Sequence, residues 1–117
     1  MSYISGFVAA VPTDKRDAFL AHARNTADVF KEYGALRVVD AWGADVPDGS
    51  TTSFPMAVKA EPNETVVFSW VEWPSKDVCD TGMAALMEDP RMAPEANPMP
   101  FDGKRLIWGN FETLNDA

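Results

Sequence analysis

The spacing of apolar residues divides the chain into segments of two kinds. Four segments are rich in β-branched and aromatic residues and are predicted to be strands: residues 3–11, 35–43, 65–73 and 104–114. Two segments repeat apolar residues at helical spacing and are predicted to be helices: residues 14–33, capped by Thr13 or Asp14 and stopped by Gly34, and residues 76–88, capped by Ser75. The elements therefore follow the order β-α-β-β-α-β.

A further apolar run, residues 54–60, lies between the second and third of these strands. It is followed by Glu61-Pro62-Asn63-Glu64, in which proline occupies the position that a type I turn favours. We therefore expect an extra hairpin arm in which residues 54–60 are extended and pair with 65–73. Such an arm could also cross to a second copy of the chain and extend its sheet.

The order of elements predicts one α+β domain over residues 1–117, with the ferredoxin-like, or split βαβ, arrangement. Right-handed crossovers place segments 3–11 and 65–73 at the centre of an antiparallel sheet. The charges agree, because the central segments carry only Glu72, whereas the segments at the edges carry several charged residues.

The two central segments are apolar at both odd and even positions, so both faces of the sheet need cover. Two helices can cover only one face. A second copy of the chain, packed sheet to sheet, is the simplest cover for the other face. The sequence therefore predicts a homodimer.

Composition and charge narrow the classes of partner. The 117 residues carry a net charge of −8 with scattered basic residues, which argues against a nucleic-acid surface. No apolar run reaches the roughly 18 residues of a membrane helix, and the first residues do not resemble a secretion signal. The single cysteine, Cys79, cannot form an intramolecular disulfide and fits a small buried residue. We expect a cytoplasmic protein that binds neither nucleic acid nor membrane.

Residues 89–103 differ from the rest because they hold four prolines. Long segments of this kind are often lids or binding loops. The alternative is a rigid crossover that only returns the chain to the sheet.

Most catalytic motifs are absent, and with one histidine there is no zinc triad, so no metal and no cofactor are predicted. Two residues are candidates for catalysis. His22 has the only side chain whose ordinary pKa suits proton transfer near neutrality. Glu72 is an acid within an apolar strand and would serve as a base if buried. A structural histidine and a solvent-facing glutamate are the alternatives.

Further residues are candidates for binding a ligand: Asp40, Trp70, Arg91, Arg105 and Trp108. Tryptophans can line a cavity, although core or dimer packing also explains them. Arg91 and Arg105 flank the proline-rich segment and could hold an anionic ligand, or they could pair with nearby acids.

Several segments together resemble one bacterial family: Phe7–Pro12, Thr52–Pro55, Glu64–Trp70, Asp89–Met92 and Met99–Arg105. These segments are similar to the uncharacterised YbaA-like family, a domain of unknown function, and the resemblance covers nearly the whole chain. It implies a dimeric α/β barrel and no assigned activity.

Two functions stay open. The first is a small-molecule-binding dimeric α/β barrel, working as a cofactor-free oxygenase or isomerase, with residues 89–103 as its lid. The second is a non-catalytic dimeric module for protein interaction or stress response, in which the tryptophans are packing and residues 89–103 are a brace.

Overall fold

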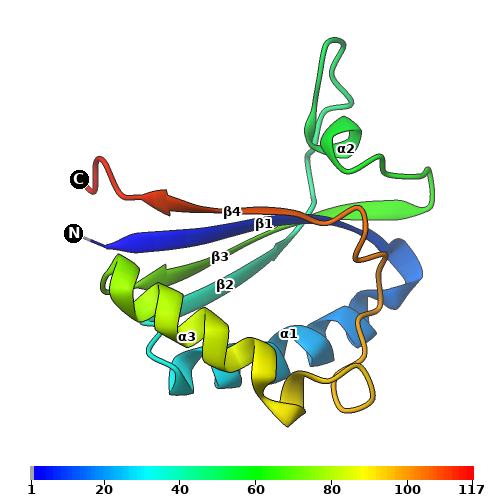
Figure 1. Cartoon of the computed structure of the whole chain (residues 1–117). Helices are drawn as coiled ribbons and strands as arrows, with labels where there is room; N and C mark the ends of the chain where they lie inside the picture. Colours follow the sequence, from blue (N-terminus) through cyan, green and yellow to red (C-terminus); the bar gives the residue numbers. More distant parts are fainter. Residues whose placement is uncertain (1) are drawn as a thin grey trace.

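Four strands form one antiparallel sheet with the order β2-β3-β1-β4 (Figure 1). In the computed structural model, which describes residues 2–117, the elements are β1 (Tyr3–Pro12), η1 (Thr13–Lys15), α1 (Arg16–Glu32), β2 (Arg37–Trp42), α2 (Phe54–Ala57), β3 (Glu64–Trp73), α3 (Lys76–Glu88), η2 (Pro90–Met92) and β4 (Ile107–Glu112). The central position predicted for β1 and β3 is confirmed. So is the ferredoxin-like order, since α1 and α3 both lie on one face of the sheet.

The two long helices begin differently. Ser75 caps α3 as predicted, because its Oγ accepts a hydrogen bond from the Val78 amide at 3.2 Å. The cap predicted for the first helix is wrong. A 3-10 turn precedes α1, no side chain caps it, and the Thr13 hydroxyl instead lies 2.8 Å from the Thr65 hydroxyl.

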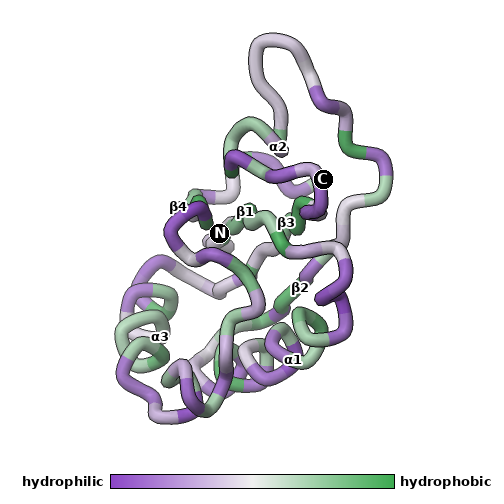
Figure 2. The backbone as a smooth tube through the Cα atoms, turned by 90° about the vertical axis from the view of Figure 1, so that its right-hand side faces the viewer, coloured by the Kyte–Doolittle hydropathy of each residue, from purple (hydrophilic) through white to green (hydrophobic). Residues whose placement is uncertain are grey.

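The predicted extended arm is wrong in its secondary structure. Residues 54–57 form the short helix α2, because the Ser53 hydroxyl accepts a hydrogen bond from the Met56 amide and Pro55 suits a first helical turn. The segment folds onto its own sheet, where Val58 packs against Ala10 and Val66. The expectation that this arm crosses to a second copy of the chain and extends its sheet is therefore wrong. Figure 2 shows α2 on the opposite side of the sheet from α1 and α3.

The face of the sheet toward α1 and α3 holds the main core. Fully buried residues there include Val71, Trp73 and Cys79. The Ser5 hydroxyl, also fully buried, accepts a hydrogen bond from Trp73 Nε1 at 3.1 Å and lies 3.6 Å from Cys79 Sγ. The expectation that Cys79 is a small buried residue is confirmed.

We call the other side of the sheet the open face. Of residues 2–117, only α2 and its flanking residues pack on it, at one end. Strand register places its central residues in adjoining rows: Val39, Trp70, Gly6 and Gly109, then Ala41, Phe68, Val8 and Ile107. The Phe68 side chain is exposed, as are those of Ile107 and Phe111 at the β4 edge. The prediction that both faces are apolar is confirmed.

Among residues 2–117, no helix is both long and apolar enough to cross a membrane.

Candidate functional site

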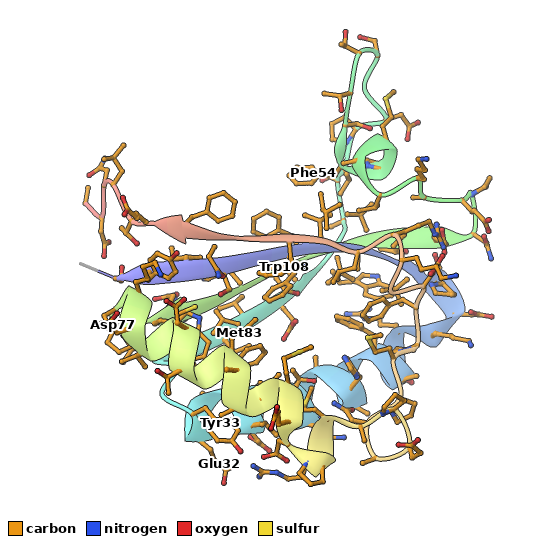
Figure 3. The ribbon with its side chains drawn as sticks, in the orientation of Figure 1. Glu32, Tyr33, Phe54, Asp77, Met83 and Trp108 are labelled. Carbon is orange, nitrogen blue, oxygen red and sulfur yellow. The ribbon has the colours of Figure 1, made fainter. Side chains whose placement is uncertain are left out.

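One row of side chains crosses the whole sheet on the helix side. Strand register aligns Asp40 on β2 with Ser69 on β3, Ser69 with Phe7 on β1, and Phe7 with Trp108 on β4. The Ser69 hydroxyl donates to Asp40 Oδ1 at 2.6 Å. Trp108 is 59% exposed, which shows that the helices leave the β4 end of this row open. In Figure 3, Trp108 and Phe54 lie on opposite sides of the sheet.

His22 lies on α1, on the same side of the sheet as this row. Its imidazole is half-buried, with its ring centroid 5.9 Å from that of Phe101 and 6.5 Å from that of Phe19. Burial lowers the pKa of His22 below 6.5, although a hydrogen bond from the imidazole to the Asn97 side chain and the charge of Asp40 oppose the shift. Burial therefore favours the neutral imidazole near pH 7.

Asn97 belongs to residues 89–103, which we call the strap, and its side chain contacts His22 directly. Asn97 is 3% exposed although the residues on both sides of it are exposed. Its Oδ1 lies 3.1 Å from His22 Nδ1, and its Nδ2 donates to Thr26 Oγ1 at 3.0 Å and to Met92 Sδ at 3.8 Å. The side-chain amide of Asn97 therefore connects the middle of the strap to α1 by hydrogen bonds.

Ion pairs fasten the first end of the strap. Arg91 pairs with Asp89 at 2.8 Å and with Glu32 at the end of α1. Asp89 also accepts a hydrogen bond from the Tyr33 hydroxyl at 2.6 Å, and Arg91 together with this bond holds the pKa of Asp89 well below its usual range. Figure 3 shows Glu32 and Tyr33 beside the end of α3, where the strap begins.

The other end of the strap is fastened to β3. Both terminal nitrogens of Arg105 donate to the Glu64 carboxylate at 2.7 Å, and Nη1 also donates to the Lys59 carbonyl. The Arg105 Nε completes the set by donating to Asp102 at 3.1 Å. Of the two explanations left open for Arg91 and Arg105, the structure therefore shows pairing with acids.

The two residues predicted to be catalytic lie on opposite faces of the sheet. Glu72 is on the open face, where it accepts a hydrogen bond from Trp70 Nε1 at 3.0 Å and lies 3.6 Å from Arg37. Neither Glu72 nor Trp70 can share a ligand with His22 within one chain. On the helix side, the Asp40 charge acts on the His22 imidazole, and Trp108 lies on the same side of the sheet at its opposite, β4 edge.

Sequence reasoning missed Asn97 and Ser69. Ser69 could have been found from strand parity, since it aligns with Asp40 once the sheet order is known. Asn97 carries no such signal, because it lies in an irregular segment where no periodicity marks a buried position.

Two surface hollows lie away from this row. One, of about 510 Å³, is lined by Pro55 and by most of the residues within 43–48 and 60–66. The other, of about 460 Å³, lies between the start of α3 and the end of β4. Neither contains a predicted site residue. The candidate site is therefore the surroundings of His22, which Asn97 and Phe101 of the strap contact. Within residues 2–117, no group of three or more His, Cys, Asp or Glu side chains could hold a metal ion.

Comparisons with known proteins identify relatives along the whole chain. A family model described as a protein of unknown function, DUF1428, matches residues 2–103. The uncharacterised protein YbaA of Escherichia coli K12 is 57% identical over 116 residues, covering 99% of each chain, and that of Shigella flexneri is equally similar.

Among solved structures, a crystal structure of a variant of SnoaB, a cofactor-independent oxygenase from Streptomyces nogalater, superimposes with a TM-score of 0.56. The match covers 98% of this chain and 95% of SnoaB at 16% identity, so it shows the fold alone. The fold is the α+β, ferredoxin-like type of dimeric α/β barrels, as predicted.

Proposed function

Because the chain belongs to the DUF1428 family of proteins of unknown function, its activity has to be inferred from its site, and we propose that it binds an uncharged small molecule beneath the strap with His22 as the base. One observation carries this proposal. The only histidine of the chain is held neutral by burial, between aromatic rings, on the open-ended side of the sheet. A neutral imidazole near pH 7 is the state that accepts a proton.

The charges around the site favour an uncharged ligand. Arg91 and Arg105 are both engaged by carboxylates, and Asp40 adds a negative charge near His22. An anion would meet repulsion from Asp40 there, and neither Arg91 nor Arg105 is free to hold it. Trp108 and Phe101 supply aromatic surface, which suits a flat apolar ligand.

Proton removal from carbon supports two reaction types without a cofactor. If the proton returns to another carbon of the same molecule, the reaction is an isomerisation. If the carbanion instead reacts with dioxygen, the reaction is an oxygenation. SnoaB, described as a cofactor-independent oxygenase, supports the second type by analogy of fold.

The proposal includes a homodimer formed through the open face. Exposed apolar side chains such as Phe68 and Phe111 are costly in water, and a second copy of the same face would cover them. A dimer of this kind leaves the helix side of each sheet, and therefore each His22 site, accessible.

Binding can be tested with 2-naphthol, a flat uncharged hydroxyaromatic. We expect it to shift the imidazole signals of His22 in NMR spectra, while the anion 2-naphthoate binds more weakly. Trp108→Ala should weaken 2-naphthol binding on the order of tenfold, because exposed aromatic surface on the helix side of the sheet is lost. Glu72→Gln, an isosteric change on the open face, should leave binding unchanged.

The proton step has its own readout. In heavy water, the wild-type protein should speed exchange of the C1 hydrogen of 2-naphthol for deuterium, and His22→Gln should not. If 2-naphthol leaves the His22 signals unmoved and native mass spectrometry finds no small molecule retained from cells, the proposal fails. The non-catalytic interaction module then becomes the better explanation.

A further inference from the structure

The hydrogen bonds around Asn97 determine where the proton of His22 lies. The Thr26 hydroxyl donates its only hydrogen to the His22 carbonyl at 2.8 Å. Its oxygen can therefore only accept from Asn97, which places the Asn97 NH₂ group, and not its carbonyl, toward Thr26. The contact of the same nitrogen with Met92 Sδ, which can only accept, agrees.

This orientation leaves the Asn97 carbonyl oxygen facing His22 Nδ1 at 3.1 Å. A carbonyl oxygen only accepts, so Nδ1 must carry the hydrogen. In the neutral ring, Nε2 then has the free lone pair. The resulting chain of donors runs from His22 Nδ1 to Asn97 Oδ1 and from Asn97 Nδ2 to Thr26. The backbone carbonyls of Asn97 and Pro98 also face the ring as acceptors.

We propose that Asn97 is a positioning residue for His22: it holds the imidazole as the Nδ1–H tautomer, which makes Nε2 the proton acceptor, and it does so only while the strap is closed. The inference rests on the proposed function for its catalytic meaning, but the tautomer itself does not. Free histidine side chains in water favour the opposite tautomer, with hydrogen on Nε2. The protein therefore selects the minor form through the Asn97 side chain.

The burial of Asn97 explains how its side-chain amide can control the tautomer of His22. Asn97 is almost fully buried, and a buried amide that lost these partners would keep the cost of its desolvation. The ion pairs of Arg91 and Arg105 fasten the two ends of the strap independently. If the middle of the strap opened at Asn97 while both ends stayed paired, His22 would become exposed and would lose its tautomer control at the same time.

The test needs no ligand, because His22 is the only histidine and nitrogen-15 chemical shifts distinguish a protonated from an unprotonated ring nitrogen. In the wild-type protein at neutral pH, we expect Nδ1 to be protonated and Nε2 to be unprotonated. Asn97→Ala should move the ring toward the Nε2–H form. Asn97→Asp keeps an acceptor at the same place and should retain the Nδ1–H form.

Two further variants keep the test decisive. Thr26→Val removes the oxygen that orients the amide and should loosen the tautomer preference even if Asn97→Ala does not fold. Glu95→Ala, an exposed change in the same strap, should leave the tautomer unchanged. A wild-type ring protonated at Nε2, or an Nδ1–H form that survives both Asn97→Ala and Thr26→Val, would overturn the inference. The Nδ1–H form without 2-naphthol binding would instead contradict only the proposed function.

Discussion

His22 is a base that the folded chain holds neutral, and this has a consequence for stability. Because burial lowers its pKa, the unfolded chain binds a proton more readily than the folded chain. The contribution of His22 to folding is therefore complete above pH 6.5 and is lost as the pH falls through 6.5 toward the lower pKa of the folded state.

We expect the urea midpoint of the wild-type protein to be lower at pH 5.5 than at pH 7.5. In His22→Gln, which keeps a polar side chain but cannot titrate, this difference should shrink. The acids with lowered pKa, such as Asp89 and Glu64, titrate at lower pH and are common to both proteins. An unchanged pH dependence in His22→Gln would show that burial of the imidazole does not control its charge.

The sequence was sufficient to recognise candidate site residues, but not to tell which of them lie together in the fold. His22 stood out as the only histidine, and Asp40 as an acid inside a strand. Strand parity could not tell which face of the sheet lies inside, because both faces are apolar. The sequence therefore could not show that Glu72 and Trp70 lie on the other face of the sheet from His22. It also could not predict the burial of Asn97, because Asn97 lies in an irregular turn without a recognisable sequence pattern.

At the scale of elements, α3 can pack closely against the sheet because Gly82 has no side chain. A methyl group there would lie 2.7 Å from both Trp73 Cζ3 and the Tyr33 carbonyl oxygen. In an exposed helix, Gly→Ala stabilises by about 1 kcal/mol. Here the close contact with fully buried Trp73 should reverse the sign.

We expect Gly82→Ala to destabilise the protein by about 1–3 kcal/mol, because α3 would have to move away from the sheet. Ala84→Gly, at an exposed position of the same helix, should cost only about 0.5–1 kcal/mol. Chemical denaturation of both variants measures the difference. If Gly82→Ala is neutral or stabilising, α3 does not pack against Trp73 as closely as described.

The elements with a clear periodic pattern of apolar residues were predicted correctly, whereas the short helix α2 was not. The four main strands and both long helices are present, although β4 begins at Ile107 and not at residue 104. Residues 54–60 are too few for a helical period to show, so their apolar character suggested a strand. The local signal that decided the outcome was the pair Ser53 and Pro55, which starts a helical turn.

For the whole molecule, the open face leads to a test of the dimer. We expect the wild-type protein to have twice the chain mass of 12.8 kDa by light scattering during size exclusion. Phe68→Glu places a charge in the middle of the open face and should give a monomer. Leu20→Glu is the matched control, because Leu20 on α1 is 45% exposed and Phe68 is 43% exposed.

A monomeric wild-type protein would contradict the proposed homodimer. If Leu20→Glu disrupts the dimer and Phe68→Glu does not, the interface lies on the helices instead. The sequence could predict a second copy because apolar residues at both parities of β1 and β3 leave one face uncovered. It could not predict that α2 already covers one end of that face.

The burial of Cys79 makes the chain a ready background for spectroscopic labelling. Its thiol is inaccessible, and burial raises its pKa, so it reacts slowly with alkylating reagents. A cysteine introduced at Glu95, on the exposed surface of the strap, would be the one reactive thiol among residues 2–117. A fluorophore or spin label attached there would report opening of the strap in real time, without prior removal of the natural cysteine.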